Sequence, residues 1–536
     1  MVLPPKIFLN SGLLLIICAV VVALSGFTIG HVIVEAAYKG ESLEFLNSFI
    51  SGQENHPLES YLTDFDALVL TLIYVCLILG ISLLLAHVLP SQLSSRIFLT
   101  LLILTPPLYL VLFVLKHHID LPVADDWSML VLVEKTIDGT LTFNDLWRQY
   151  NEYRLFFPRL ILLPVARASA WNLTYEIIIN LAIAAATFLA ISLQVMRTAK
   201  RNGHELTPWI FPLLSVQVFS LMQWENWMMG FQTNYMLGAF AVIAAIVALD
   251  RPGKSLLCVF FAAWLGIVAS YSSVNGLLVW PIGFAMLLFS SSALGTRKAG
   301  LLLTWSLVAS VVVFLYLYGL EVNVDGTSIG AAAYTKFVVN YLGASFIKGH
   351  ALTPLAGFLG LLFFAYFAYR VVRSGTLSIE DMLPYLAIAL FAIMAAMLTG
   401  LGRLDHSPRA AHASRYTTIS LWLWAAIAVF ISFLSGSKKQ SQKPYSGWDR
   451  LAIFSMIAVL FLGFLVNSYW TSRKAAVWWQ EHHLRPARDH IMSVDKLEAL
   501  DPTLVKRLTA GYATVEQTKA RLSVLKRRKL AAFRKK

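Results

Sequence analysis

Apolar runs of about 17 to 25 residues recur along the whole chain, and they constrain its fold more than any other feature. As an α-helix, each run is long enough to cross the roughly 30 Å hydrocarbon layer of a bilayer. Only 14% of the 536 residues are charged, whereas soluble proteins carry about a quarter. The runs are continuous rather than alternating, which excludes a transmembrane barrel. The sequence therefore predicts an all-α, polytopic membrane protein.

We expect roughly thirteen membrane-spanning helices, with boundaries taken from the apolar runs. The three cysteines, Cys18, Cys76 and Cys258, all fall inside these runs, so they indicate neither a disulfide framework nor a metal site. The expected spans lie near 8–37, 65–89, 97–117, 173–197, 207–222, 233–249, 255–271, 276–291, 300–319, 354–372, 383–400, 418–435 and 451–469.

The segments between the spans differ in charge, which predicts the orientation of the chain. Short basic connections alternate with acidic ones, and positively charged loops face the cytoplasm. The N-terminus is therefore expected in the cytoplasm of a cell (inner or plasma) membrane. The net charge of +13 follows from these connections and does not indicate a nucleic-acid partner. The basic connections are 197–205, 250–254, 291–300, 370–375 and 436–450, and the acidic side receives 39–66 and the segment 118–172.

Two adjacent carboxylates, Asp125 and Asp126, follow directly on the apolar run 97–117. A carboxylate at the bilayer edge can act as a general base on a hydroxyl group. The pair can instead hold a divalent cation such as Mg²⁺ or Mn²⁺, or it can cap a helix that begins at Trp127. Two short amphipathic stretches, separated at Asp138 and Gly139, come next. We therefore expect interfacial helices on the outer face.

The apolar stretch 154–171 is unsuited to crossing the bilayer. It is short, contains Pro158 and Pro164, and carries Arg159 and Arg167. A helix that lies in the outer membrane surface fits these residues better, because its basic groups can reach the headgroup layer.

This order of features resembles the GT-C superfamily of membrane glycosyltransferases. It comprises an apolar span, an acidic pair, interfacial helices, the proline-bearing "NEYRLFFPRL" and a span that ends in basic residues. The chain is similar in particular to the bacterial branch related to protein O-mannosyltransferases and the lipid A aminoarabinose transferase. The resemblance covers 97–200 in detail and 200–435 as a pattern of spans. It implies that Asp125, or as second choice Asp126, is the essential acid of the first outer loop.

Other polar residues at the expected outer ends complete the candidate site. Arginine suits bidentate binding of phosphate oxygens, although lipid headgroups offer the same chemistry. Glu225 lies between Trp224 and Trp227, which resemble aromatic-belt residues, and it needs a partner such as an arginine of the 400–418 loop. The candidates for binding the donor phosphate are Arg403, Arg409, Arg415 and Tyr416, and those for lining the substrate site are Glu152, Arg154, Arg159, Glu225, Asn226 and Asn275.

The sequence contains no P-loop or dinucleotide-binding motif, which disfavours a nucleotide-driven reaction. We expect a glycosyltransferase of the cell envelope that moves a sugar from a polyprenyl-phosphate carrier to an outer-face glycan or lipid. Asp125, Asp126 and Glu225 are the candidate ligands if a divalent cation takes part. An O-antigen or polysaccharide polymerase or ligase, and a flippase or transporter of lipid-linked sugars, are the alternatives.

Two regions are expected in the chain. Residues 1–470 form the transmembrane glycosyltransferase-like domain with its interfacial segment 118–172, and residues 471–536 form a basic helical C-terminal tail. An odd number of spans places this tail outside, although its final "KRRKLAAFRKK" is a charge run typical of cytoplasmic segments.

Overall fold

The computed structural model is mostly helical in the residues that it describes, which agrees with an all-α membrane protein. It describes residues 13–39 except 15 and 18, the single residues 58, 62, 65, 69 and 73, and the ranges 91–250, 256–291, 295–321, 330–348, 352–404, 408–438, 447–493, 501–509 and 514–535. The expected span 65–89 lies almost wholly outside the described residues. The expected span 8–37 is represented by η1 (Val22–Gly26) and α2 (Phe27–Lys39).

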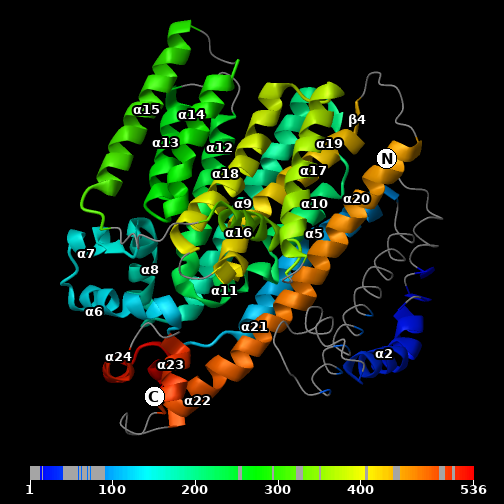
Figure 1. Ribbon diagram of the computed structural model, residues 1–536. Helices are drawn as coiled ribbons and strands as arrows, with labels where there is room; N and C mark the ends of the chain where they lie inside the picture. Colours follow the sequence, from blue (N-terminus) through cyan, green and yellow to red (C-terminus); the bar gives the residue numbers. More distant parts are fainter. Residues whose placement is uncertain are drawn as a thin grey trace.

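Within the described residues, seven helices are long and apolar enough to cross a membrane, and they form an upright bundle (Figure 1). Two shorter apolar helices, α13 (Leu256–Ser270) and α14 (Val279–Phe289), stand among them. The count of thirteen is therefore not confirmed. The long helices are α5 (Ser91–His117), α9 (Leu173–Asn202), α12 (Thr233–Leu249), α15 (Gly295–Leu317), α17 (Thr353–Arg373), α18 (Ile379–Arg403) and α19 (Thr417–Ser435).

The bundle is arranged around α19, whose apolar window is wholly buried. The windows of α5 and α15, by contrast, are only 22% buried. Their exposed side chains are large and apolar, as Leu112 and Phe314 illustrate at 67% and 65% exposure. A helix that exposes such residues needs an apolar solvent, so this distribution suits a bilayer around the bundle.

The expected span 207–222 contains a regular helix of only nine residues, α10 (Ile210–Val218). The segment nevertheless runs the length of its neighbour α19. At one end the Thr207 hydroxyl lies 2.8 Å from that of Ser432, and at the other the Thr418 hydroxyl donates to Gln223 at 2.5 Å. Residues outside the regular helix therefore complete the passage from one end of the bundle to the other.

Two opposite ends of the bundle collect the two classes of connection. At one end, called the basic end here, β3 (His204–Glu205) pairs with β4 (Ser437–Lys438), and Arg201 binds Asp250 and Asp381. At the other end, called the site end, the segment 118–172 meets the turns 219–232 and 271–278 and the last residue of α18, Arg403. Among the described residues, parts of the basic connections 197–205, 370–375 and 436–450 thus lie at the end opposite to the segment 118–172.

The site end is built from short elements. The left-handed Gly139 (φ 70°) ends α6, and the expected break between two helices is found there. A hairpin of two strands, each two residues long, follows α7, and the sequence did not predict it. The elements are η3 (Ala124–Met129), α6 (Leu130–Asp138), α7 (Phe143–Trp147), β1 (Gln149–Tyr150), β2 (Tyr153–Arg154), α8 (Phe156–Ser169), η4 (Leu221–Gln223), α11 (Trp224–Met228), η5 (Gly230–Gln232), η6 (Val274–Leu278), α16 (Ala331–Gly343), η7 (Pro408–His412) and η8 (Ser414–Tyr416).

A continuous helical rod runs from residue 447 to residue 493 and leads into the tail, in orange and red in Figure 1. At 1.5 Å per residue it is about 70 Å long, more than twice the hydrocarbon thickness. It therefore extends beyond the bundle at the site end. Its parts are α20 (Gly447–Val466), η9 (Asn467–Ser472), α21 (Arg473–Trp479), η10 (Gln480–Leu484) and α22 (Arg485–Ser493), and the tail continues with α23 (Pro502–Thr509), α24 (Val515–Arg527) and η12 (Ala531–Lys535).

Candidate functional site

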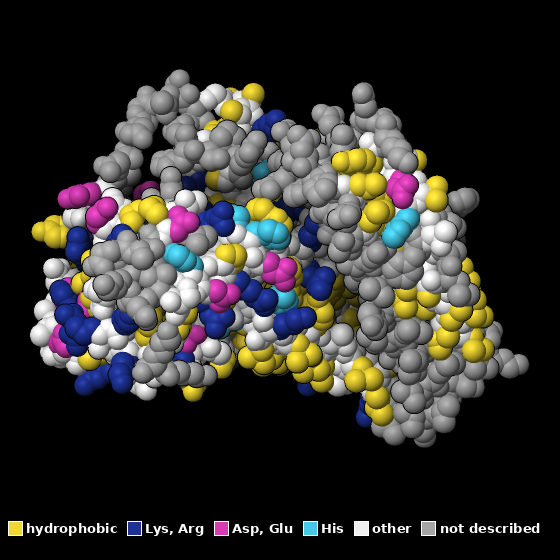
Figure 2. All heavy atoms as spheres, turned by 90° about the horizontal axis from the view of Figure 1, so that it is seen from below, with side chains coloured by type: hydrophobic (Ala, Val, Ile, Leu, Met, Phe, Trp, Pro, Cys, Tyr) yellow, Lys and Arg dark blue, Asp and Glu magenta, His cyan; other side chains and the backbone are white. Residues whose placement is uncertain are grey.

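Charged side chains of both signs gather on the face of the molecule at the site end, which Figure 2 shows from below. The acidic pair lies on η3 within this region. Val123 enters the helix in an extended conformation, and Ala124 then adopts a left-handed one (φ 48°). The two carboxylates that follow point to different partners.

Asp126 is buried, with 3% of its surface exposed, and both of its carboxyl oxygens accept backbone hydrogen bonds. Oδ2 accepts from the N–H of Val123 at 3.1 Å, and Oδ1 accepts from the N–H of Phe231 at 2.8 Å. Burial raises the pKa of Asp126 to about 7, the two hydrogen bonds oppose this rise, and the charge of Asp125 adds to it. The helix thus begins at Ala124 and not at Trp127, as the capping alternative expected, and Asp126 binds the N–H of its N-cap from the third helical position. Asp126 also links η3 to η5.

Asp125 is half-buried, and its Oδ1 accepts a hydrogen bond of 2.7 Å from the hydroxyl of Tyr150. Tyr150 belongs to the hairpin, where its ring contacts those of Phe231 and Tyr153 at 5.0 and 5.9 Å between centroids. The second oxygen, Oδ2, receives no hydrogen bond from the described residues. Of the two acids, Asp125 therefore keeps a free acceptor for a substrate hydroxyl.

Tyr153 lies between the acidic and the basic parts of the site. Burial raises the pKa of its hydroxyl well above the ordinary value, and the charge of Asp125 raises it further. The charge of Arg403 acts in the opposite direction. The hairpin links the two charges directly, because Tyr150 binds Asp125 and Glu152, two residues further along, binds Arg403.

Glu225 pairs with the 400–418 loop, one of the partners expected for it. Its Oε2 accepts hydrogen bonds of 2.9 Å from the N–H of Arg415 and from the hydroxyl of Ser414. Its Oε1 lies 3.4 Å from the guanidinium of Arg415, and the Ser414 hydroxyl accepts from the N–H of Glu225 in return. Asn226 adds hydrogen bonds to the carbonyl of Arg415 and to Thr418. These hydrogen bonds and the ion pair hold α11 against η8.

Two arginines present their guanidinium groups to the site from different elements. Arg403, the last residue of α18, binds Glu152 of the hairpin at 3.0 Å. The side chains of Arg403 and Arg415 are 29% and 32% exposed. Each arginine therefore makes one ion pair and keeps donors that an incoming phosphate oxygen can use.

Aromatic rings surround the second arginine. Tyr416 stacks on Tyr341 at 5.6 Å between centroids and meets Tyr235 edge-on at 5.9 Å. The guanidinium of Arg415 lies 5.2 Å from the ring centroid of Tyr416. Lys348 is close enough to Glu225 that the carboxylate opposes the lowering of the pKa of Lys348 by burial.

Arg154 and Arg159 bind carbonyl groups of the protein instead of facing the site. The guanidinium of Arg154 donates to the carbonyls of Tyr316, Trp147 and Tyr318 at 3.0, 3.0 and 2.6 Å. Arg159 binds carbonyls at the end of α7, and burial lowers its pKa to about 10. Both side chains are buried, and their hydrogen bonds hold the hairpin and α7.

Two further candidates are placed only in part. Asn275 lies buried on η6, and its Oδ1 has no partner among the described residues. The side chain of Arg409 lies outside the described part of the structure. In that part, no group of three His, Cys, Asp or Glu side chains has the arrangement of a metal site.

Sequence reasoning missed Glu176, in the first turn of α9. It is 4% exposed, accepts a 3.0 Å hydrogen bond from the indole N–H of Trp171, and lies against Gly230. An acidic residue inside an apolar run was the signal available for it. Trp227 also differs from expectation, because it is fully buried and donates to the carbonyl of Ser220 instead of lying in an aromatic belt.

An apolar groove of about 620 Å³ opens between α8, α13 and α15. Tyr271 at its wall neighbours Tyr316, whose hydroxyl bonds to the carbonyl of Glu152 at 3.4 Å. The groove therefore lies close to the Glu152–Arg403 pair. It is lined by Trp147, Phe156, Phe157, Leu160, Trp264, Ile267, Tyr271, Leu307, Val308, Val311, Val312 and Leu315.

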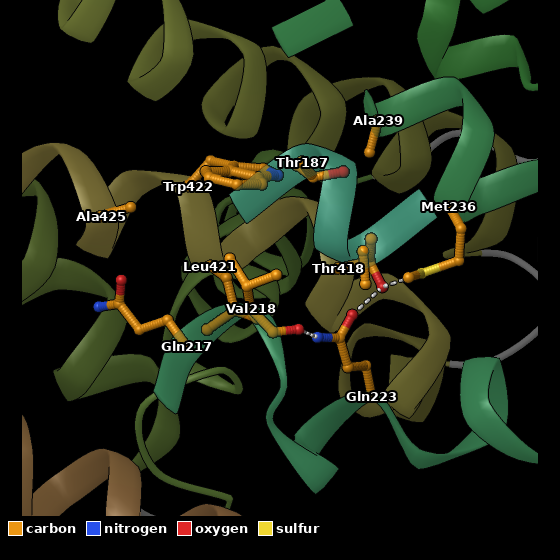
Figure 3. A pocket seen from close by; sticks show the side chains of 11 residues that line it. Thr187, Gln217, Val218, Gln223, Met236, Ala239, Thr418, Leu421, Trp422 and Ala425 are labelled. Atoms are coloured by element: carbon orange, nitrogen blue, oxygen red, sulfur yellow. Dashed lines mark hydrogen bonds between the residues drawn. The ribbon is translucent and has the colours of Figure 1, made fainter. Parts of the chain in front are cut away.

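A second cavity, of about 20 Å³, lies deeper, between α9, α10, α12 and α19 (Figure 3). Thr418 and Gln223 meet at its wall, while the buried amide of Gln217 has no partner among the described residues. This space suits one or two water molecules and is too small for a substrate. Of these two spaces, the groove is the larger, and the cavity has room only for water.

Comparison of the chain with family models, with curated proteins and with solved structures found no match.

Proposed function

We propose that this chain is a membrane glycosyltransferase that moves a sugar from a polyprenyl-phosphate carrier to a glycan or lipid acceptor. The proposal includes a GT-C-like fold with roughly thirteen spans, a cytoplasmic N-terminus and a site on the outer face of the cell membrane. One observation supports it: the hairpin that binds the half-buried Asp125 also binds the partly exposed guanidinium of Arg403, and the partly exposed Arg415 follows in η8.

The free Oδ2 of Asp125 suits the role of general base. An acceptor hydroxyl gives its proton to this oxygen while its own oxygen forms a bond to the anomeric carbon. The bond from that carbon to the phosphate oxygen breaks, and its electron pair leaves with the lipid phosphate. A single base of this kind supports a displacement with inversion.

The positive charges suit the other half of the reaction. Negative charge develops on the departing phosphate, and Arg403, Arg415 and Tyr416 offer donors for it. The partial exposure of both guanidinium groups supports this assignment. The apolar groove between α8, α13 and α15 offers a space for hydrocarbon on the membrane side of the site. A divalent cation, if one takes part, would share the phosphate with these cations.

The test is direct transfer by the purified full-length protein. Detergent-solubilised protein is incubated with a panel of polyprenyl-phosphate sugars and with candidate glycan and lipid acceptors, with and without a chelator. We expect loss of the sugar from one carrier and the appearance of free polyprenyl phosphate. Movement of a labelled carrier across liposomes without any transfer would contradict the proposal and favour the transporter alternative.

A further inference from the structure

Six non-glycine residues of the described structure adopt left-handed backbone conformations, and all of them lie in one region. Such conformations are unfavourable for residues with a Cβ and persist only where surrounding contacts hold them. Four belong to the segment 118–172 and two to the C-terminal tail that packs on it. They are Ala124, Asn151, Ala170, Trp171, Lys529 and Ala531, with φ between 47° and 53°.

The tail supplies contacts to this region from η12. The N–H of Ala531 donates to the carbonyl of Ala170 at 3.0 Å, and the N–H of Ala532 donates to the carbonyl of Asp120 at 2.8 Å. The guanidinium of Arg534 binds the carboxylate of Asp120 and lies 3.3 Å from the carbonyl of Ser169. One short helix of the tail thus holds both ends of the segment that carries the acids.

Asp120 connects Arg534 of the tail to the start of α9. Its Oδ1 accepts a 3.1 Å hydrogen bond from the N–H of Leu173, while its Oδ2 is bound by Arg534. Leu173 directly follows the left-handed pair Ala170–Trp171 and the N-cap Asn172. The ion pair therefore fixes the conformation of the chain where it enters α9.

From α9 a series of direct contacts reaches the acidic pair. Trp171 donates its indole N–H to Glu176, and Glu176 packs so closely on Gly230 that a Cβ there would overlap its carboxylate. Gly230 precedes Phe231, whose N–H binds Asp126. Asp126 and Asp125 are neighbours on η3, so the contacts run without a gap from Arg534 to the candidate base.

A second anchor holds the tail to the same segment. Arg528 binds both oxygens of Asp138 at 2.7 and 2.8 Å and lies 3.5 Å from Glu134. α23 packs on η3 itself. The tail therefore packs on η3, which carries the acids, and on α6, which follows it.

We propose that Arg534 is a positioning residue, which acts through Asp120 and the turn 169–173 to hold η3 in the conformation that aims Asp125 at its substrate. The inference rests on the proposed function for its catalytic consequence. Its structural consequence can be measured independently of that function. The tail is then part of the site rather than an appendage of the membrane domain.

The experiment compares Arg534→Ala with Arg534→Lys and with a control, Arg527→Ala, in the full-length protein. Arg527 is on the same tail, but its side chain is 72% exposed and its nearest carboxylate oxygen is 4.0 Å away. Peptide-level hydrogen exchange is measured for 120–127 and 169–176 and for the buried α19. Sugar transfer is measured on the same samples.

For Arg534→Ala we expect exchange in the two peptides to speed up about tenfold, with α19 unchanged. The transfer rate kcat should fall about a hundredfold while the KM for the lipid donor stays similar, since misplacement of a catalytic group by about 1 Å has this effect. Arg534→Lys should retain most of the exchange protection and most of the transfer rate. Arg527→Ala should resemble the unchanged protein in both measurements. Unaltered exchange in both peptides, or faster exchange throughout α19, would overturn the proposal. Absence of transfer from the unchanged protein would count against the proposed function alone.

Discussion

The hydroxyl of Tyr150 donates a 2.7 Å hydrogen bond to Oδ1 of Asp125, and it does so from a hairpin that the apolar pattern did not predict. The bond holds the carboxylate in one orientation and occupies one oxygen. The hairpin also carries Glu152, the partner of Arg403. The hairpin therefore binds both the candidate base, Asp125, and one of the two arginines, Arg403.

Replacing Asp125 with Asn should leave the protein folded and lower sugar transfer about 10²- to 10⁴-fold, because the amide cannot accept the proton. Transfer from a lipid-linked donor by purified protein measures this. The control is Asp489→Asn, whose side chain is 69% exposed and lies on the tail. Full activity in both Asp125→Asn and Asp126→Asn would show that the mechanism is wrong.

Removal of the guanidinium of Arg415 should slow transfer about 10²- to 10³-fold, as losing one donor to a developing negative charge does. Arg415→Lys should retain part of the activity, because an ammonium group keeps the charge without the forked geometry. Arg488→Ala, at a 46% exposed position on α22, is the matched control. Equal activity in Arg415→Ala and the control would show that Arg415 does not take part in the transfer.

The burial of Asp126 predicts how stability depends on pH. Its folded-state pKa of about 7 lies above the ordinary value of 3.8. Between these two pH values the carboxyl is protonated in the folded protein and ionised in the unfolded chain. Its contribution to stability is therefore fully present below about pH 4 and is lost as the pH rises toward 7. In Asp126→Asn this contribution cannot titrate. We expect the Tm difference between pH 5 and pH 8 to shrink in this variant, and an unchanged difference would contradict the burial of the charge.

Gly230→Ala should destabilise the protein strongly, because the new methyl group would occupy the space of the Glu176 carboxylate and separate η5 from α9. The matched control is Gly300→Ala in α15, where a Cβ meets nothing within 4 Å and alanine favours the helix by about 1 kcal/mol. Thermal unfolding in detergent compares the two. A Tm for Gly230→Ala equal to that of the control would contradict the packing of Glu176 on this turn.

A bulky side chain in the apolar groove should hinder a long lipid donor more than a short one. Leu160→Trp projects from α8 into the groove, whereas Leu189→Trp on α9 is 57% exposed and does not line it. We expect the KM for a long-chain donor to rise about tenfold in Leu160→Trp, with a smaller change for a short-chain donor. The same KM shift in Leu189→Trp would point to a general effect on the membrane surface.

The sequence predicted the features that depend on local pattern. Apolar length located α9, α12, α17, α18 and α19 to within a few residues, and the alternation of basic connections separated the two ends of the bundle. Gly139 and the prolines of 154–171 predicted the break after α6 and the short α8, because these residues act on the backbone beside them.

The partners of individual side chains could not be predicted in the same way. Asp126 binds the N–H of a residue 105 positions away, and Arg154 binds carbonyls more than 160 positions away. A backbone group offers the same chemistry at every position, so no residue type marks it as a partner. This explains why the carbonyl partners of Arg154 and Arg159 could not be predicted.

At the end of the bundle remote from the acids, Arg201 binds Asp250 at 2.8 Å and Asp381 at 3.1 Å, and so ties α9, the end of α12 and α18 together. A carrier that shuttles its cargo through the bilayer has to part its helices at both mouths in turn. Parting them here would strand the largely buried Asp250 without its counter-ion, a heavy penalty in a poorly hydrated setting. These ion pairs therefore oppose opening of the bundle at that end, and a lipid donor of the kind proposed would have to approach the acids at the site end.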